Sequence, residues 1–222
     1  MGELSFLPAT EQARLVREGE VSPVELVETY LERIERLDPE LGAFVTVCGE
    51  QALADAREKA GAPAETPFHG VPIAFKDLDT TAGIRTTFSS KPFAENIPDF
   101  DLAHVARTRT AGFVVLGKTN TPEFGTTAFT DSPLNGPCRT PWDLGRNAGG
   151  SSGGAAAAVA AGLDADLLHV GPLGGRGRER VAPLVAGDEV EVRSGVQRRP
   201  CNRRGRAEPD ARHERRVRDA TA

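Results

Sequence analysis

The sequence has few residues of several kinds, and each shortage excludes a class of protein. Its 222 residues include one Met, one Trp, one Tyr and three cysteines. Cys48, Cys138 and Cys201 are too few and too widely spaced for a disulfide framework or a CxxC metal clamp. No run approaches the roughly 20 apolar residues of a membrane span, and residues 1–20 lack the basic start and apolar stretch of a signal peptide. We expect a soluble cytoplasmic protein with no membrane partner.

Charge and composition divide the chain into two unlike parts. Residues 1–170 carry 14 Lys and Arg against 24 Asp and Glu, whereas residues 171–222 carry 13 against 8. All 13 of those basic residues are Arg, and the same stretch has no Phe, Ile, Trp, Tyr or Met. Residues 171–222 therefore offer too little apolar surface for burial to offset the conformational entropy that the chain loses on folding. We therefore predict two unlike parts that meet near residues 165–171, the first folded and the second, over residues 169–222, a disordered Arg-rich tail.

The first part shows the periodicity of alternating helices and strands. Apolar spacing, Pro and Gly positions predict helices over residues 10–17, 22–37, 51–60, 101–112 and 155–161. Short apolar runs predict strands over residues 44–47, 71–76 and 113–116, and residues 125–150 read as loop. Helices that alternate with buried strands are typical of an α/β layered domain.

A glycine-rich turn, Gly149–Gly154, leads into the Ala-rich helix and permits several interpretations. It lacks the Gly-Lys-Ser/Thr ending of a phosphate loop and the G-x-G-x-x-G spacing of a dinucleotide site. It does match G-x-S-x-G twice, at Gly149 and Gly150, as in the nucleophile elbow of α/β-hydrolases. That elbow needs a strand directly before it, and residues 141–147 make a poor strand.

Lys76 ends an apolar strand and is the second unusual feature. Burial disfavours an ammonium group and lowers its pKa. A neutral lysine is a general base, and a nearby serine hydroxyl would be its partner. The turn's backbone N–H groups could then bind an oxyanion. Alternatively, Lys76 extends to solvent and pairs with Asp77 or Asp79.

Four motifs, in order and with consistent spacing, resemble those of the amidase signature family. They are Gly70–Asp77, Gly117–Gly125, Gly136–Asp143 and Gly149–Gly154 with the helix that follows. The resemblance covers roughly residues 8–168 and implies the N-terminal portion of the family's α/β fold, a mixed sheet flanked by helices. It also implies hydrolysis of small carboxamides through a serine acyl-enzyme, or release of ammonia for tRNA-dependent amidation, with no metal or cofactor.

The resemblance assigns roles to particular residues of this sequence. Lys76 would be the base, and Ser151, preceded by a cis peptide, would relay a proton between Lys76 and the nucleophile. Ser152, with Gly149 and Gly150, would support the turn or contact substrate.

The family's nucleophile, however, is a serine in an Asp-x-Gly-Gly-Ser turn. Here the nearest equivalent is Pro172–Arg176, so Arg176 stands where the attacking hydroxyl is expected, and only Ser194 follows. An arginine side chain is not a nucleophile. We therefore predict that the chain is inactive, with an active amidase that takes its nucleophile from Ser194 or a partner chain as the alternative. A change of reading frame near residues 163–170 would account for the Arg-rich remainder.

Other functions and residues have simpler interpretations. A basic tail that binds nucleic acid is disfavoured by its eight acidic residues and absent aromatics. A non-catalytic interaction protein stays open as an alternative, and no oligomeric state is predicted. We expect Phe124 and Trp142 in the core, His69 on a surface loop, and Lys118 in a structural ion pair.

Overall fold

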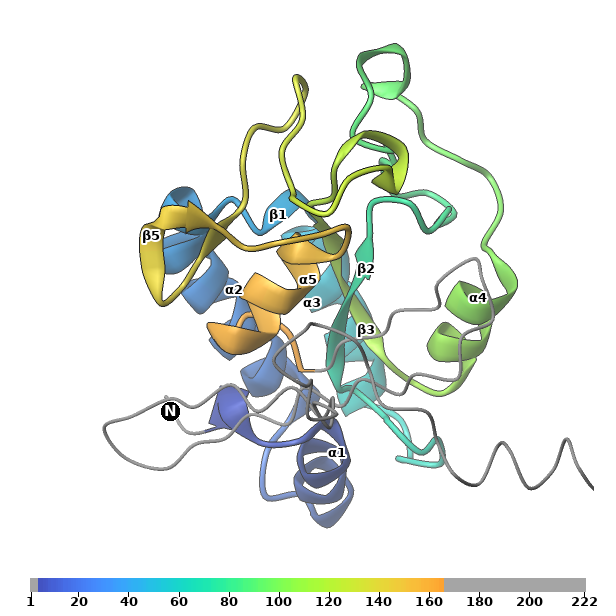
Figure 1. Ribbon diagram of the computed structural model, residues 1–222. Helices are drawn as coiled ribbons and strands as arrows, with labels where there is room; N and C mark the ends of the chain where they lie inside the picture. Colours follow the sequence, from blue (N-terminus) through green and yellow to red (C-terminus); the bar gives the residue numbers. More distant parts are fainter. Residues whose placement is uncertain (1–3, 166–222) are drawn as a thin grey trace, which may run out of the picture. The chain divides into compact units, whose positions relative to one another are not determined.

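The computed structural model describes residues 4–165 (Figure 1). The predicted disordered tail, residues 169–222, lies outside the described residues. The helices are η1 (Leu4–Phe6), α1 (Ala9–Glu18), α2 (Pro23–Leu41), α3 (Gly49–Ala60), η2 (Lys91–Phe93), α4 (Ala103–Thr110), η3 (Glu123–Gly125) and α5 (Gly153–Ala160). The strands are β1 (Phe44–Val47), β2 (Pro72–Lys76), β3 (Val114–Thr119), β4 (Arg139–Thr140) and β5 (Asp143–Asn147). Within this part of the chain, no helix combines the length and apolar character that crossing a bilayer requires.

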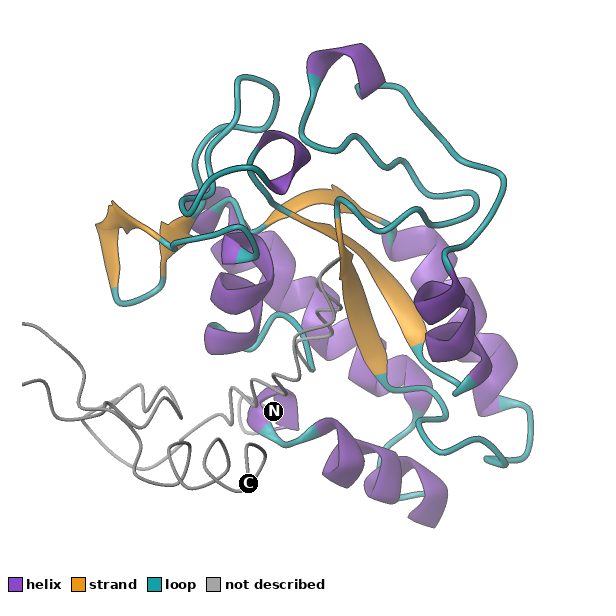
Figure 2. Ribbon diagram, turned by 45° about the vertical axis from the view of Figure 1, so that its right-hand side comes forward, coloured by secondary structure: helices purple, strands orange, loops and turns teal. Residues whose placement is uncertain are grey.

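The central sheet is mixed and has the strand order β1-β3-β2. β3 pairs in parallel with β2 and antiparallel with β1. Helices lie on both sides of these strands (Figure 2). The predicted α/β fold with a mixed sheet flanked by helices is therefore confirmed.

Side-chain alternation along β2 and β3 divides the core into two clusters. Ala74, Val114 and Leu116 pack with residues of α2, α3 and α5. Ile73, Phe75 and Val115 pack with residues of α1 and α4 instead. Because successive side chains point to opposite faces of a strand, Lys76 shares the face of Ala74, on the side of α5. The sheet's alternation thus sets the direction in which this lysine points.

α2 begins where the sequence predicts and ends later. Ser22 Oγ accepts a hydrogen bond from the Glu25 N–H at 3.1 Å, and the Glu25 carboxylate accepts one from the Ser22 N–H at 3.0 Å. The predicted stop at Leu37 is wrong, because Pro39 lies inside the helix. The helix ends at Leu41, after which Gly42 adopts a left-handed φ of 60° and the Asp38 carboxylate accepts the Ala43 N–H at 2.7 Å.

Loss of this N-terminal capping box has a measurable expected cost. Ser22→Ala removes the acceptor for the Glu25 N–H and is expected to lower the free energy of unfolding by about 1 kcal/mol. Ser22→Asp keeps an acceptor at the same position and serves as the control. Urea denaturation followed by circular dichroism measures both. Equal stability of the alanine and aspartate variants would contradict this account of the cap.

The segment before the glycine-rich turn also differs from its prediction. Residues 143–147, judged a poor strand, form β5, which pairs antiparallel with β4. All five residues of β5 are exposed, so backbone pairing rather than apolar burial makes this strand. It belongs to a separate two-stranded sheet. A nucleophile elbow requires a strand of the central sheet directly before the serine. The strand that precedes Ser151 is β5, which is exposed and lies outside that sheet.

Candidate functional site

The fold brings Lys76 together with two serines that lie 75 and 76 residues away in the chain. Lys76 ends β2, while Ser151 and Ser152 lie in the turn that opens α5, which packs beside β2 (Figure 1). Lys76 Nζ donates to Ser151 Oγ at 2.8 Å and to Ser152 Oγ at 2.9 Å. The side chain is 4% exposed. The alternative in which Lys76 extends to solvent is therefore wrong.

Backbone and side-chain hydrogen bonds hold the serine turn against the end of β3. Thr121 Oγ1 donates to the carbonyl oxygen of Ser151 at 2.9 Å. The N–H of Gly153 donates to Thr130 Oγ1 at 3.1 Å, and the N–H of Gly154 donates to the Asn120 carbonyl at 3.1 Å. These bonds fix the turn at Ser151 and directly after Ser152.

Two glycines allow this close approach, and the peptide bond between Gly150 and Ser151 is cis. A Cβ atom on Gly150 would lie 2.9 Å from the backbone nitrogen of Phe129. A Cβ atom on Gly154 would lie 2.3 Å from the backbone nitrogen of Asn120. Gly149 donates its N–H to Asn147 Oδ1 at 3.0 Å. The glycines at 150 and 154 are thus required by backbone contacts.

Burial controls the electrostatics of Lys76. It lowers the pKa of this amine to about 8, and the nearby Asp79 carboxylate opposes the shift. Near neutral pH such an amine is neutral far more often than an ordinary lysine, whose pKa is about 10.4. The arrangement therefore makes a base available near neutral pH and places it within hydrogen-bond distance of two hydroxyls.

The lowered pKa of Lys76 is directly measurable, because the chain has only four lysines. In heteronuclear NMR of isotopically labelled lysine, Lys76 is expected to titrate near pH 8. The signal that disappears in Lys76→Arg belongs to Lys76. Lys91→Arg, at an exposed position, is the control and should leave that signal in place. A midpoint for Lys76 at or above the ordinary lysine value of about 10.4 would contradict the assigned environment.

A second buried lysine supports the loop after β2. Lys118 is fully buried and donates to Thr81 Oγ1 at 2.9 Å and to the Asp79 carbonyl. Burial lowers its pKa to about 8, although the carboxylates of Asp77 and Asp79 favour the charged form. We expected a structural ion pair, but the direct partners of Lys118 are a carbonyl and a hydroxyl.

Sequence reasoning missed the part played by Asp77. This carboxylate is fully buried and accepts the N–H groups of Thr87 at 2.9 Å and Ser89 at 3.3 Å, together with the Thr87 hydroxyl. Burial raises the pKa of the Asp77 carboxyl above its ordinary value, and these hydrogen bonds offset part of that shift. The available signal was a carboxylate directly after the strand-ending lysine. Asp77 thereby fastens residues 87–89 next to Lys76.

Three other predicted placements are wrong. His69 is 7% exposed rather than on the surface, and its Nε2 lies 2.9 Å from the Lys59 carbonyl oxygen. Phe124 and Trp142, expected in the core, are 52% and 53% exposed. Phe124 lies in the short helix η3, and Trp142 lies between β4 and β5, so neither belongs to the central sheet or to a long helix packed on it.

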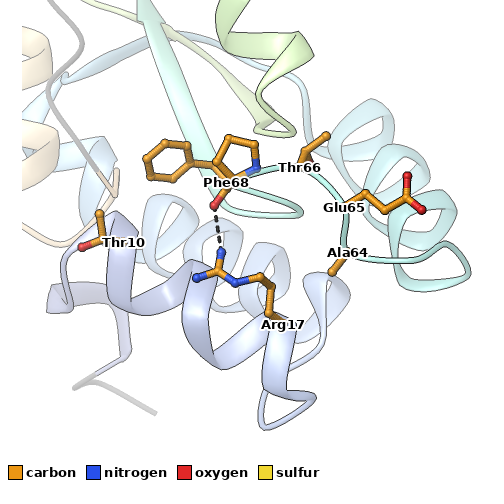
Figure 3. A pocket seen from close by; sticks show the side chains of 7 residues that line it. Thr10, Arg17, Ala64, Glu65, Thr66 and Phe68 are labelled. Atoms are coloured by element: carbon orange, nitrogen blue, oxygen red, sulfur yellow. Dashed lines mark hydrogen bonds between the residues drawn. The ribbon is translucent and has the colours of Figure 1, made fainter.

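Two hollows on the surface of the described part are lined by residues other than Lys76, Ser151 and Ser152. Figure 3 shows one of them, where Arg17 Nη1 donates to the Pro67 carbonyl at 2.9 Å. Its lining residues are Thr10, Arg17, Ala64, Glu65, Thr66, Pro67 and Phe68. Another lies between α3, Arg109 and β3. Within residues 4–165, no group of His, Cys, Asp and Glu side chains could hold a metal ion.

Comparison with known proteins agrees with this geometry. The model of a protein family described as Amidase matches residues 25–165. The chain belongs to the amidase family. It is 43% identical, over 164 residues, to an acylamidase from Rhodococcus erythropolis, covering 72% of this chain and 34% of that protein.

Two further relatives extend the amidase comparison. One subunit of the glutamyl-tRNA(Gln) amidotransferase from Salinispora tropica is 45% identical over 166 residues, covering 72% of this chain and 34% of that protein. The solved structure of a 6-aminohexanoate cyclic dimer hydrolase matches with a TM-score of 0.67 and 42% identity, covering 72% of this chain and 33% of that one. This amidase-family chain therefore spans about a third of the length of the curated relatives it matches.

Proposed function

We propose that residues 4–165 supply the base and the proton relay of an amide-hydrolysing site. The observation that carries this proposal is the buried Lys76 amine at 2.8 Å from Ser151 Oγ. A neutral amine there can accept the Ser151 proton while Ser151 takes the proton of an attacking hydroxyl. Ser152, the second hydrogen-bond partner of the amine, orients Lys76 toward the turn.

The same relay serves both halves of acylation. The attacking oxygen forms a bond to the amide carbonyl carbon, and its proton passes through Ser151 to Lys76. As the C–N bond breaks, the proton returns by the same route to the leaving nitrogen, which departs as ammonia or an amine. Water then hydrolyses the resulting ester and regenerates the hydroxyl. The names of the acylamidase and hydrolase relatives support amides as the substrate class.

The attacking group is the missing element of this proposal. By resemblance to the family it would occupy the position of Arg176, whose guanidinium cannot act as a nucleophile. We therefore expect the chain alone to form no adduct with a fluorophosphonate, as measured by intact mass. A stoichiometric adduct on Ser194, or on any other hydroxyl, would overturn this part of the proposal.

A graft tests whether the described residues are competent when a nucleophile is present. Residues 4–165 would replace the matched third of the Rhodococcus erythropolis acylamidase, to which the chain is 43% identical in this region. The grafted enzyme is expected to release ammonia from acetamide or benzamide, with the parent acylamidase as the reference. A folded graft that hydrolyses neither amide would contradict the proposed function.

We also propose that the reading frame changes near residues 163–170, because the composition alters there and the Gly-Gly-Ser turn of the family is replaced by Gly174-Gly175-Arg176. The nucleotide sequence of the gene tests this proposal. An alternative frame that encodes a Gly-Gly-Ser turn after residue 170 is the expected result. Alternative frames that all lack such a turn would contradict it.

A further inference from the structure

Three aromatic rings form a partly exposed group that the proposed chemistry does not use. This phenylalanine cluster consists of Phe88, Phe93 and Phe124. The rings of Phe88 and Phe93 meet edge to face with centroids 5.3 Å apart, as do those of Phe93 and Phe124 at 6.1 Å. Phe88 and Phe124 are stacked at 6.4 Å. Phe93 is 39% exposed and Phe124 is 52% exposed, so ring surface faces solvent.

The backbone beneath two of the rings adopts an uncommon conformation. Phe88 has φ 54° and Phe124 has φ 52°, in the left-handed region that bulky residues rarely occupy. Such conformations cost free energy and persist where the surrounding structure imposes them. The Phe124 N–H donates to the Phe88 carbonyl at 2.9 Å. This hydrogen bond connects the backbones of the two strained residues directly.

The phenylalanine cluster is attached to the lysine side of the site. The Phe88 N–H donates to the Asp77 carbonyl at 3.1 Å. The Asp77 carboxylate accepts from Thr87 and Ser89, the residues on either side of Phe88. Because Asp77 directly follows Lys76, the position of the Phe88 ring is tied to the strand end that carries the amine.

The phenylalanine cluster also borders the serine side of the site. Gly125 directly follows Phe124, and a Cβ atom on Gly125 would lie 3.8 Å from Ser151 Oγ. The chain that carries the Phe124 ring therefore lies against the Ser151 side chain. Both sides of the phenylalanine cluster are thereby connected to the Lys76–Ser151 pair, one through Asp77 and the other through Gly125.

We propose that the phenylalanine cluster binds the ring of an aromatic amide whose carboxamide lies at Ser151. Aromatic rings pair favourably in offset-stacked and edge-to-face arrangements beyond the effect of area alone. Exposed ring surface held beside a reactive group by strained backbone is suited to such a ligand. This inference rests on the proposed function, because it places the carboxamide at the proposed relay.

Fluorine NMR with para-fluorobenzamide as the probe tests the inference on the chain as it exists. Saturable binding to the unaltered chain is expected, and Phe124→Ala is expected to weaken it about fivefold or more. Phe124→Leu keeps apolar volume without the ring and is expected to fall between them. Phe100→Ala is the matched control, because Phe100 is 57% exposed and lies outside the phenylalanine cluster. Thermal melts establish that each variant is folded.

The outcomes separate this inference from the proposed function. No binding to the unaltered chain, equal weakening by Phe100→Ala, or unchanged binding by a folded Phe124→Ala would each overturn the aromatic subsite. If the graft hydrolyses acetamide while para-fluorobenzamide fails to bind, only the subsite is wrong. If para-fluorobenzamide binds and Phe124→Ala weakens it, but the graft hydrolyses no amide, only the proposed function is wrong.

Discussion

In the grafted enzyme, Lys76→Met is expected to lower kcat/KM for amide hydrolysis about 1,000-fold, within the range of a positioned general base. Methionine fills the space of the buried side chain but can neither accept nor return a proton. The rate before substitution is expected to rise with pH and to level off above about pH 8, because only the neutral amine is a base and burial lowers the pKa of Lys76 to about 8. Ammonia release measured across this pH range checks both statements.

The control for this substitution is Lys91→Met, which removes the same charge at an exposed position outside the site. It is expected to leave kcat/KM within about twofold, as surface substitutions remote from a site usually change little. Ser151→Ala removes the relay hydroxyl and is expected to lower kcat/KM about 100-fold or more. A Lys76→Met graft that is folded and retains a tenth of the activity would contradict the role of Lys76 as the base.

Gly154→Ala is expected to destabilise the chain by about 3 kcal/mol, at the upper end of the cost of overpacking. The added Cβ would lie 2.3 Å and 2.5 Å from the backbone nitrogen and oxygen of Asn120, and 2.6 Å from the carbonyl oxygen of Ala43. These are backbone atoms of neighbouring segments, so they cannot rotate away as a flexible side chain would. Separating them would also break the 3.1 Å hydrogen bond from Gly154 to Asn120.

Gly61→Ala is the matched control for Gly154→Ala. Its Cβ would make ordinary contacts of 3.6 Å and 3.8 Å with the carbonyl oxygens of Glu58 and Arg57. Gly61 has φ −88°, which alanine adopts freely, so a change within about 0.5 kcal/mol is expected. Urea unfolding midpoints measure both variants, with soluble yield as a second readout. Equal midpoints for the two variants would contradict the close backbone contact at residue 154.

Local sequence features predicted the elements of the fold well where they act over a few residues. Ser22 and Pro23 marked the start of α2, and the apolar runs near residues 72 and 114 marked the two parallel strands. The errors lie where backbone hydrogen bonds, rather than apolar spacing, decide the outcome. β5 forms because Arg139 and Thr140 pair with it, and apolar periodicity carries no record of such pairing. Likewise, α2 continues past Pro39 and ends where Gly42 adopts a left-handed conformation and the Asp38 carboxylate accepts the N–H groups of Ala43 and Phe44.

The sequence by itself determined that Lys76 ends a buried strand and that a glycine-rich serine turn opens a helix, because apolar runs and glycine spacing are local properties. Only the tertiary structure decided that the Lys76 amine meets Ser151 and Ser152 at hydrogen-bond distance. It also placed Phe124 on the surface beside this site instead of in the core. The physical reason is that contacts between residues 75 positions apart depend on how α5 packs against β2. In that packing, Gly154 brings α5 close to the backbone of Asn120 and Ala43, which no local pattern describes.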